Sequence, residues 1–317
     1  MDSATPEVLI DAPGHRGRLA RGFAALGIRG ENPAHTSAVG QTAFNWIRVV
    51  FGLALLYNTW TSLSWQHKTA AAQALGLPTS SPVLHLLVIV LVFVQLAVAM
   101  SVLFNRGVTP MSWIGILHSL YIWVIFQHGG DFGQDGTDPG VSMAYVVMFL
   151  FLIAGDQHRT NQDLSKNPYM TLARTVFGLL WAYDAMMKFH PYFMNHFVDF
   201  LTSAETTMKG TWGAGYDHLF VILTNAIGPH LVPVLVALTE SAVALSLISG
   251  RGLRILAPVG FVLSLVIWST AETWGGPYPL GVSTSGGQMF GNAIIYTMAF
   301  CYILTLYNPL DLLRGRR

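Results

Sequence analysis

Charged residues are scarce in this chain of 317 residues. Only 10% of the residues are Asp, Glu, Lys or Arg, whereas 52% are hydrophobic, and a typical soluble domain is about 25% charged. The net charge of +1 creates no field that would attract a nucleic acid. The composition therefore excludes an ordinary soluble protein and a nucleic-acid partner, and it favours a lipid bilayer as the surroundings.

Cysteine and the common cofactor motifs are lacking too. The single cysteine, Cys301, rules out an internal disulfide, a CxxC redox pair and a cysteine-ligated cluster. The sequence contains no phosphate-binding glycine loop, no HExxH and no GxSxG. We predict no metal site, and the sequence assigns no bound cofactor.

The histidines do not form a recognisable set of ligands. His85 and His118 lie in two expected helices but at different depths, which argues against a haem held by both. His128 precedes three aspartates whose spacing matches no metal-binding loop, so a solvated loop is the favoured interpretation: Asp131, Asp135 and Asp138.

The first 42 residues lack the apolar run of a cleavable signal peptide. They are polar, contain Gly and Pro at intervals, and include four arginines. We expect residues 1–42 on the cytoplasmic side. Residues 16–30 form either a short amphipathic helix on the membrane surface or part of a disordered tail.

Eight apolar runs approach the length of about 20 residues that a membrane helix needs. Segment 218–227 is too short to cross and is expected to form an interfacial or re-entrant helix. The predicted fold class is therefore all-α, a polytopic membrane protein with eight transmembrane helices. The runs lie at residues 44–65, 82–104, 111–127, 141–155, 172–189, 230–249, 253–272 and 289–307.

Lysine and arginine set the expected orientation of these spans. If the N-terminus is inside, all but three of the 17 Lys and Arg residues lie on the cytoplasmic side, as the positive-inside bias requires. The exceptions are Lys68, Lys188 and Lys209. Both termini are then cytoplasmic, and we predict a multi-pass protein of a bacterial or archaeal cytoplasmic (inner) membrane.

The spans contain an internal repeat. RVVFGLALLYNTWTSL, from Arg48, aligns without a gap with RTVFGLLWAYDAMMKF, from Arg174, and VQLAVAMSVLFNRG aligns with TESAVALSLISGRG. Each half has both ends inside, so we predict a parallel repeat of two four-helix bundles. The predicted domains are 43–158 and 168–310, the second with an outer loop at 190–229.

The second half carries the charge. Three ionisable residues there align with neutral polar residues of the first half: Asp184 with Asn58, Lys188 with Ser62, and Glu240 with Gln95. Asp184 lies about 15 Å into the fifth span at about 1.5 Å per residue, and Lys188 follows on the same helix face. We expect Glu240 at mid-depth of the sixth span and Glu272 near the outer end of the seventh.

These four residues are the predicted catalytic group. Because a charge at the bilayer centre costs roughly 2.5–3.5 kcal/mol, they must pair with one another or face a wet cavity. One interpretation is a structural Asp184–Lys188 pair, with Glu240 bonding across helices. The other is a polar pocket that binds a small polar substrate or a quinone head group and moves protons. Candidate substrate-binding residues are Tyr183, His190 and Trp274, with Trp212, Tyr216 and His218 as lid residues.

The second half resembles the DoxX/DoxD-like integral membrane family. In that family an arginine opens the first helix, a glycine follows four residues later and a lysine closes it, as Arg174, Gly178 and Lys188 do here. A glutamate followed by a basic Gly turn marks the second helix, as Glu240 and Arg251-Gly252 do. The resemblance covers residues 43–310, weakly in the first half, and it implies two fused four-helix units.

That family includes the membrane subunit of thiosulfate:quinone oxidoreductase. The resemblance therefore implies a quinone-linked redox role, with quinone as a substrate and other membrane-complex subunits as partners. It also suggests a small sulfur compound such as thiosulfate as the reductant. Two alternatives stay open at this stage. One is a non-catalytic scaffold subunit of a respiratory or photosynthetic complex, and the other is a small-solute transporter.

Overall fold

The structure is a computed structural model that describes residues 38–63, 65–127, 129, 140–158, 168–275 and 291–306. Within these ranges the chain forms helices joined by turns and contains no β-strand. The predicted all-α class is confirmed for this part of the chain. The expected amphipathic segment at 16–30 and the loop from His128 to Asp138 lie outside the described residues, except for Gly129.

Each of the eight expected spans coincides with a helix, and three further α-helices lie between them. In chain order the helices are α2 (Ala38–Ser62), α3 (Trp65–Leu75), α4 (Pro82–Phe104), α5 (Val108–Ile125), α6 (Val141–His158), α7 (Pro168–Lys188), α8 (Pro191–Thr207), α9 (Trp212–Ile227), α10 (Leu231–Ser249), α11 (Leu253–Ser269) and α12 (Gly291–Leu306), with a short 3-10 turn, η2 (Thr273–Gly275), after α11.

Within the described residues, three helices are long and apolar enough to cross a membrane: α4, α5 and α10. Three more are apolar but slightly shorter, namely α6, α11 and α12. Large apolar side chains such as Leu86, Phe93 and Leu245 are exposed on the helix surfaces, and so wide an apolar surface is unusual in a soluble monomer. These features favour a membrane location.

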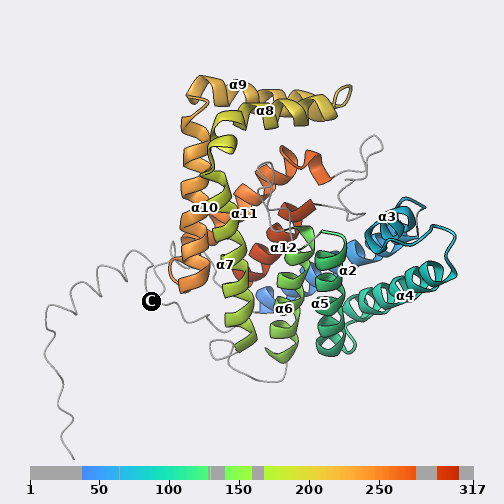
Figure 1. Cartoon of the computed structure of the whole chain (residues 1–317). Helices are drawn as coiled ribbons and strands as arrows, with labels where there is room; N and C mark the ends of the chain where they lie inside the picture. Colours follow the sequence, from blue (N-terminus) through green and yellow to red (C-terminus); the bar gives the residue numbers. More distant parts are fainter. Residues whose placement is uncertain are drawn as a thin grey trace, which may run out of the picture.

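The outer region at 190–229 holds more helix than the sequence predicts. We expected one short helix there, but α8 and α9 pack against each other as a hairpin that lies across the ends of α7 and α10 (Figure 1). Helix α8 begins at Pro191, with His190 as its N-cap. Its apolar side chains are spaced along one face, as Phe193, Leu201 and Ala204 show by their burial. An amphipathic helix of this kind has no continuous apolar run for a span search to find.

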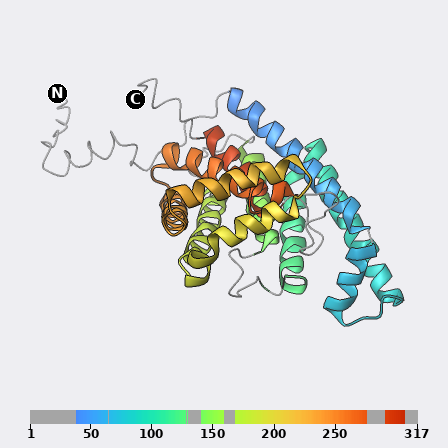
Figure 2. The ribbon, with the colours of Figure 1, turned by 90° about the horizontal axis from the view of Figure 1, so that it is seen from above.

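The eight helices at the expected spans associate mainly as pairs. Helix α2 packs along α4, α5 along α6, α7 along α10, and α11 along α12. Helices α6 and α12 contact each other, and they also contact α7 and α2 respectively. Seen from above, α2 and α4 extend together away from the other helices (Figure 2).

The core lies where α6, α7 and α12 meet. Its centre is aromatic, with the rings of Phe177 and Phe300 4.8 Å apart and those of Trp181 and Phe300 5.2 Å apart. Phe300 fits against Gly260 of α11 so closely that a Cβ there would lie 2.3 Å from the ring. This packing fixes the face that α7 turns towards α12, and therefore the direction of the polar residues further along α7.

Candidate functional site

A buried ion pair joins α7 to α10. The Lys188 ammonium lies 2.9 Å from Oε2 of Glu240, and the two side chains are 11% and 2% exposed. Lys188 is the last residue of α7, and Glu240 is the central residue of α10. The convergence of these two residues, predicted from their expected depths, is therefore observed, and the lysine pairs with the glutamate of the neighbouring helix.

Asp184 lies one turn before Lys188 on α7 and is also buried. Residues 177, 181, 184 and 188 follow the spacing of one helix face, so the aromatic core leads directly to the polar residues. Tyr183, next to Asp184, is half-buried. The result is three ionisable side chains in two adjacent helices: Asp184, Lys188 and Glu240.

The register between α7 and α10 is set at the opposite end of the pair. Arg174 donates a hydrogen bond of 2.7 Å to the carbonyl oxygen of Leu247, close to the end of α10. Gly178 lets the two helices approach, because a Cβ there would lie 2.9 Å from the backbone nitrogen of Ile248. This close contact places Lys188 level with the middle of α10, where it reaches Glu240.

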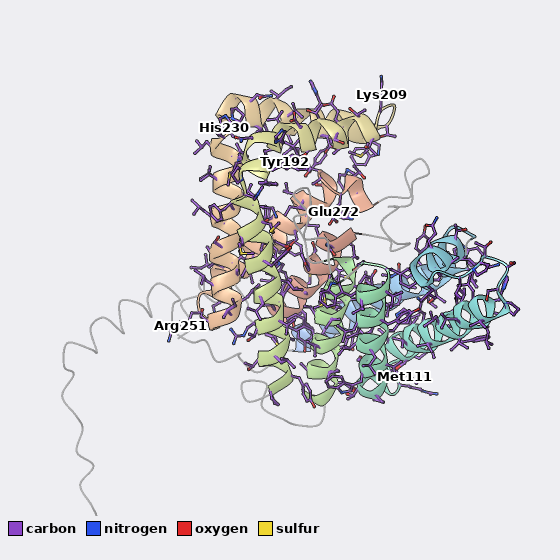
Figure 3. The ribbon with its side chains drawn as sticks, in the orientation of Figure 1. Met111, Tyr192, Lys209, His230, Arg251 and Glu272 are labelled. Carbon is purple, nitrogen blue, oxygen red and sulfur yellow. The ribbon has the colours of Figure 1, made fainter. Side chains whose placement is uncertain are left out.

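The α8–α9 hairpin covers the Lys188 end of the site. The Lys188 ammonium lies 5.7 Å from the ring centre of Phe193, in the first turn of α8. This is within the range of a cation–π contact. His190, a predicted substrate-binding residue, caps α8 by accepting a hydrogen bond from the backbone N–H of Tyr192. Figure 3 shows Tyr192 at this junction, and His230 and Arg251 at opposite ends of α10.

Glu272 lies just after α11, near the end of the seventh expected span. Its carboxylate accepts hydrogen bonds from the backbone N–H groups of Asn292 (3.0 Å) and Ala293 (3.1 Å), at the N-terminus of α12. A carboxylate there satisfies orphan N–H groups and interacts favourably with the helix dipole. Glycine suits position 291, because the positive φ of 66° there is one that other residues rarely adopt, and a Cβ would also crowd the carboxylate of Glu272. The carboxylate thus has a capping role, which the prediction of a catalytic group did not foresee.

Trp274 belongs to an aromatic cluster under the start of α9. Its ring centre lies 4.9 Å from that of Trp212, 5.4 Å from that of Tyr216 and 5.2 Å from that of Trp268. The hydroxyl of Tyr216 lies 2.8 Å from the hydroxyl of Ser269. Two expected lid residues, Trp212 and Tyr216, therefore join the hairpin to the end of α11 through Trp274.

The first half shows contacts of the same form with neutral partners. Arg48 donates to the carbonyl oxygen of Leu103 at 2.8 Å, near the end of α4, as Arg174 does near the end of α10. Asn58 donates to the hydroxyl of Tyr145 at 2.7 Å. The amide nitrogen of Gln95 lies 3.1 Å from Nε2 of His118. None of these contacts contains an ion pair.

One further pair of matching positions was missed in the sequence. Gln127 accepts a hydrogen bond from the backbone N–H of Ser142 at the start of α6, in the way that Glu272 caps α12. The signal was available, because the alignment of Ile122-Trp123 with Ile267-Trp268 continues to these two residues. Gln127 and Glu272 are therefore a fourth aligned pair in which the first half has a neutral residue and the second half an ionisable one.

The hairpin buries one more carboxylate. Asp217 of α9 is 0% exposed, and neither of its oxygens has a hydrogen-bond partner among the described residues. Burial, and secondly the charge of Glu205, raises the pKa of Asp217 to about 7. Glu205 itself lies 3.1 Å from Nδ1 of His218, which the sequence suggested as a lid residue.

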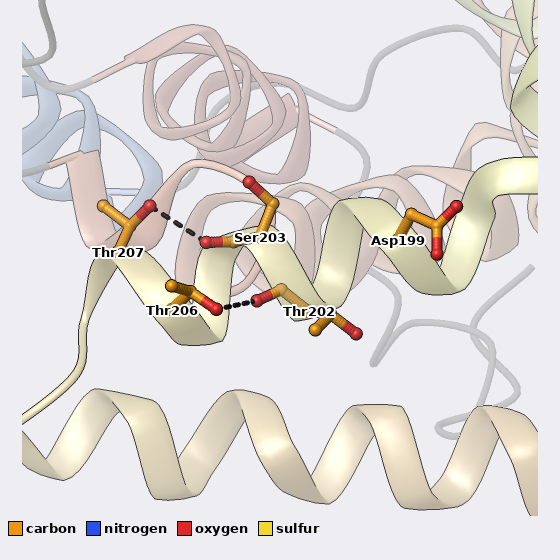
Figure 4. A pocket seen from close by; sticks show the side chains of 5 residues that line it. All are labelled: Asp199, Thr202, Ser203, Thr206 and Thr207. Atoms are coloured by element: carbon orange, nitrogen blue, oxygen red, sulfur yellow. Dashed lines mark hydrogen bonds between the residues drawn. The ribbon is translucent and has the colours of Figure 1, made fainter.

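A metal-binding cluster and a surface hollow on α8 are the two other candidates for a site. In the described part of the chain no three His, Cys, Asp or Glu side chains are grouped to hold a metal ion, and His85 instead contacts Lys68. A shallow hollow of 410 Å³ on α8 is lined by five polar residues (Figure 4). Three of its hydroxyls, those of Thr202, Thr206 and Thr207, donate back to carbonyl oxygens of their own helix.

The buried ionisable side chains of α7 and α10 form the arrangement best suited to bind a ligand or transfer protons. It has an amine that can hold an anion or a carbonyl oxygen, and carboxylates that can exchange protons. It is also enclosed, with Phe193 over the ammonium. The chain matches no protein-family model, no curated protein and no solved structure, so a functional assignment depends on this geometry.

Proposed function

We propose that the chain is a membrane-embedded subunit of a quinone-linked redox system, and that Asp184, Lys188 and Glu240 form its substrate and proton site. The observation that carries the proposal is the Lys188–Glu240 pair, 2.9 Å long and almost inaccessible to solvent. Ionisable side chains inside a membrane are rare and usually serve transport, proton transfer or ligand binding.

The fold of this subunit is a duplicated four-helix unit with eight spans and both termini in the cytoplasm. Matching contacts support the duplication. Arg48 of α2 and Arg174 of α7 both donate to carbonyl oxygens near the ends of the next long helices, α4 and α10. Gly115 meets Phe149 as Gly260 meets Phe300. The bias of Lys and Arg to one side supports the orientation in a bacterial or archaeal inner membrane.

The chemistry of the site suits a quinone. Reduction of a quinone to a hydroquinone takes up two electrons and two protons. Lys188 is suited to hold a carbonyl oxygen as negative charge develops on it, and Glu240 is suited to relay a proton. The resemblance to the DoxX/DoxD-like family supports the same substrate and suggests a small sulfur compound, such as thiosulfate, as the reductant. Electrons then pass directly or through a partner subunit.

A turnover assay with matched variants tests the proposal. Asp184→Asn with Glu240→Gln copies the residues of the first half, and it should abolish quinone-dependent oxidation of the reductant in membranes or in the purified complex. The control is Asn58→Ala with Gln95→Ala, which alters the aligned positions of the first half and should leave turnover within about twofold of wild type. Full turnover of the first variant would refute the proposed role of the site.

A second candidate function is a non-catalytic scaffold subunit. The observation that favours it is that Lys188 and Glu240 satisfy each other, as a purely structural pair would. In that case the Asp184→Asn/Glu240→Gln variant should leave the activity of the parent complex intact and reduce the amount of complex assembled. Blue native electrophoresis together with the turnover assay separates the two functions. A liposome flux assay with the same variant tests a transporter.

A further inference from the structure

Asn292 is a buried amide that the proposed site does not yet use. It is the second residue of α12 and is only 3% exposed. Neither its side-chain oxygen nor its side-chain nitrogen has a hydrogen-bond partner among the described residues. An unsatisfied buried polar group costs about 1–3 kcal/mol, so an amide with both ends unpaired needs an explanation.

The position of Asn292 is level with the charged site. Helix α12 starts beside Glu272, at the end of the molecule where α7 finishes with Lys188, and it runs towards the end marked by Arg174. Tyr296, one turn after Asn292 on the same face, packs against Trp181, with ring centres 6.1 Å apart. Asp184 is one turn from Trp181 in the direction of Lys188.

Trp181 adds a second unpaired donor. Its ring is 2% exposed, and its indole Nε1 has no acceptor among the described residues. Buried tryptophans usually find a partner for this N–H. Helices α7 and α12 therefore each carry a buried, unpaired hydrogen-bonding group within one helical turn of the contact between Trp181 and Tyr296.

The first half lacks this feature. By the alignment of the two halves, Leu55 stands at the position of Trp181, and Val141 stands at the position of Asn292, just as Ser142 stands at the position of Ala293. The amide and the indole are thus confined to the half that carries the charge. A role common to both bundles, such as helix packing, does not account for them.

We infer that Asn292 and Trp181 bind the ring oxygen of a quinone head group in both of its oxidation states. This inference rests on the proposed function and names two further binding residues for it. A carboxamide donates N–H to the carbonyl oxygen of a quinone and accepts O–H from a hydroquinone. The indole N–H donates to the same oxygen in either state. A lysine or a carboxylate alone would favour one state over the other.

The test measures binding separately from turnover. Purified protein in nanodiscs is titrated with a short-chain benzoquinone, and then with its hydroquinone, while thermal unfolding and the dissociation constant are recorded. Asn292→Val copies Val141 and removes both unpaired atoms. We expect its Tm without ligand to equal or exceed that of wild type, and its dissociation constants for both redox forms to rise by about threefold to tenfold, since each form loses one hydrogen bond to its ring oxygen.

Two more variants make the result specific. Trp181→Phe keeps the aromatic packing and should weaken the binding of both redox forms by about threefold to tenfold, the effect of one hydrogen bond. Tyr145→Phe, in the first half, removes the acceptor of Asn58. It should lower the Tm without ligand and leave the dissociation constants unchanged.

The outcomes separate this inference from the proposed function. If Asn292→Val lowers the Tm without ligand and binds the quinone as wild type does, the amide is structural and the inference is wrong. If that variant loses binding but the Asp184→Asn/Glu240→Gln variant still turns over, the inference stands and the assigned proton site is wrong. If the wild type binds neither redox form, both are wrong.

Discussion

Removal of one member of the Lys188–Glu240 pair should destabilise the protein far more than removal of both. At 2.9 Å the attraction between the two charges is about 6 kcal/mol for an effective dielectric constant of about 20. Burial of each charge costs several kcal/mol, so the pair contributes little net stability. A charge left alone keeps its cost of burial and loses its partner, which should destabilise the fold by about 3–5 kcal/mol.

The experiment is a double-mutant cycle in bicelles. Glu240→Gln and Lys188→Ser are made singly and together, and the free energy of unfolding is measured by titration with dodecyl sulfate, followed by tryptophan fluorescence. Each single variant should lose about 3–5 kcal/mol, and the double variant, which copies Gln95 and Ser62, should lose about 1–2 kcal/mol. The coupling energy is then several kcal/mol.

The control is a variant of the first half. Ser62→Ala removes only the hydrogen bond of 2.9 Å from that hydroxyl to the carbonyl oxygen of Asn58, and it should cost about 0.5–1.5 kcal/mol. Losses that simply add in the double variant would mean that the two charges do not stabilise each other. The explanation of charge in this half as a mutually compensated pair would then fail.

Three further results are expected from the structure. Because burial raises the pKa of Asp217 to about 7 from 3.8, the carboxyl stays neutral in the folded hairpin after it ionises in the unfolded chain, so stability should fall as pH rises from about 4 to about 7. Asp217→Asn should remove this slope and raise the Tm at pH 8, and a slope equal to that of wild type would contradict the assignment. Glu272→Ala should cost about 1–2 kcal/mol by uncapping α12, whereas Glu272→Gln should cost less, both measured as unfolding free energies; equal losses would show that the cap is not responsible. Gly178→Ala places a Cβ 2.9 Å from the backbone nitrogen of Ile248 and should lower the Tm by several degrees, while Gly215→Ala meets nothing within 4 Å and should keep or raise it; a neutral Gly178→Ala would mean that α7 and α10 can separate freely.

The helices could be predicted where the sequence is continuously apolar. The expected run at 82–104 coincides with α4, and the run at 230–249 differs from α10 by one residue at its start. Helix α3 was missed because it is short and only weakly apolar. Helix α8 was missed because its apolar residues lie on one face, and burial of that face depends on a neighbouring helix. A long apolar run indicates a helix from the sequence alone, because its surroundings are apolar on all sides. An amphipathic surface helix depends on contacts with its neighbours, which the sequence does not show.

The site could be predicted in part for a similar reason. The meeting of Lys188 and Glu240 follows from depth, because two antiparallel helices bring residues of equal depth together. The hydrogen bonds of Glu272 to the start of α12 do not follow from depth. The chain turns sharply at Thr273 and Trp274, two non-glycine residues with positive φ (48° and 62°), and this turn directs the carboxylate to the start of α12. Asn292 stayed hidden because it lies inside an apolar run.

The short connection between α7 and α8 has a mechanical consequence. Only Phe189 and His190 separate Lys188 from the first residue of α8, and Phe193 contacts the ammonium from the first turn of that helix. The hairpin and the cation must therefore move together. A partner that tilts the hairpin from outside would pull the ammonium away from Glu240, so an event at the molecular surface would alter the buried charges without any rearrangement of the aromatic core.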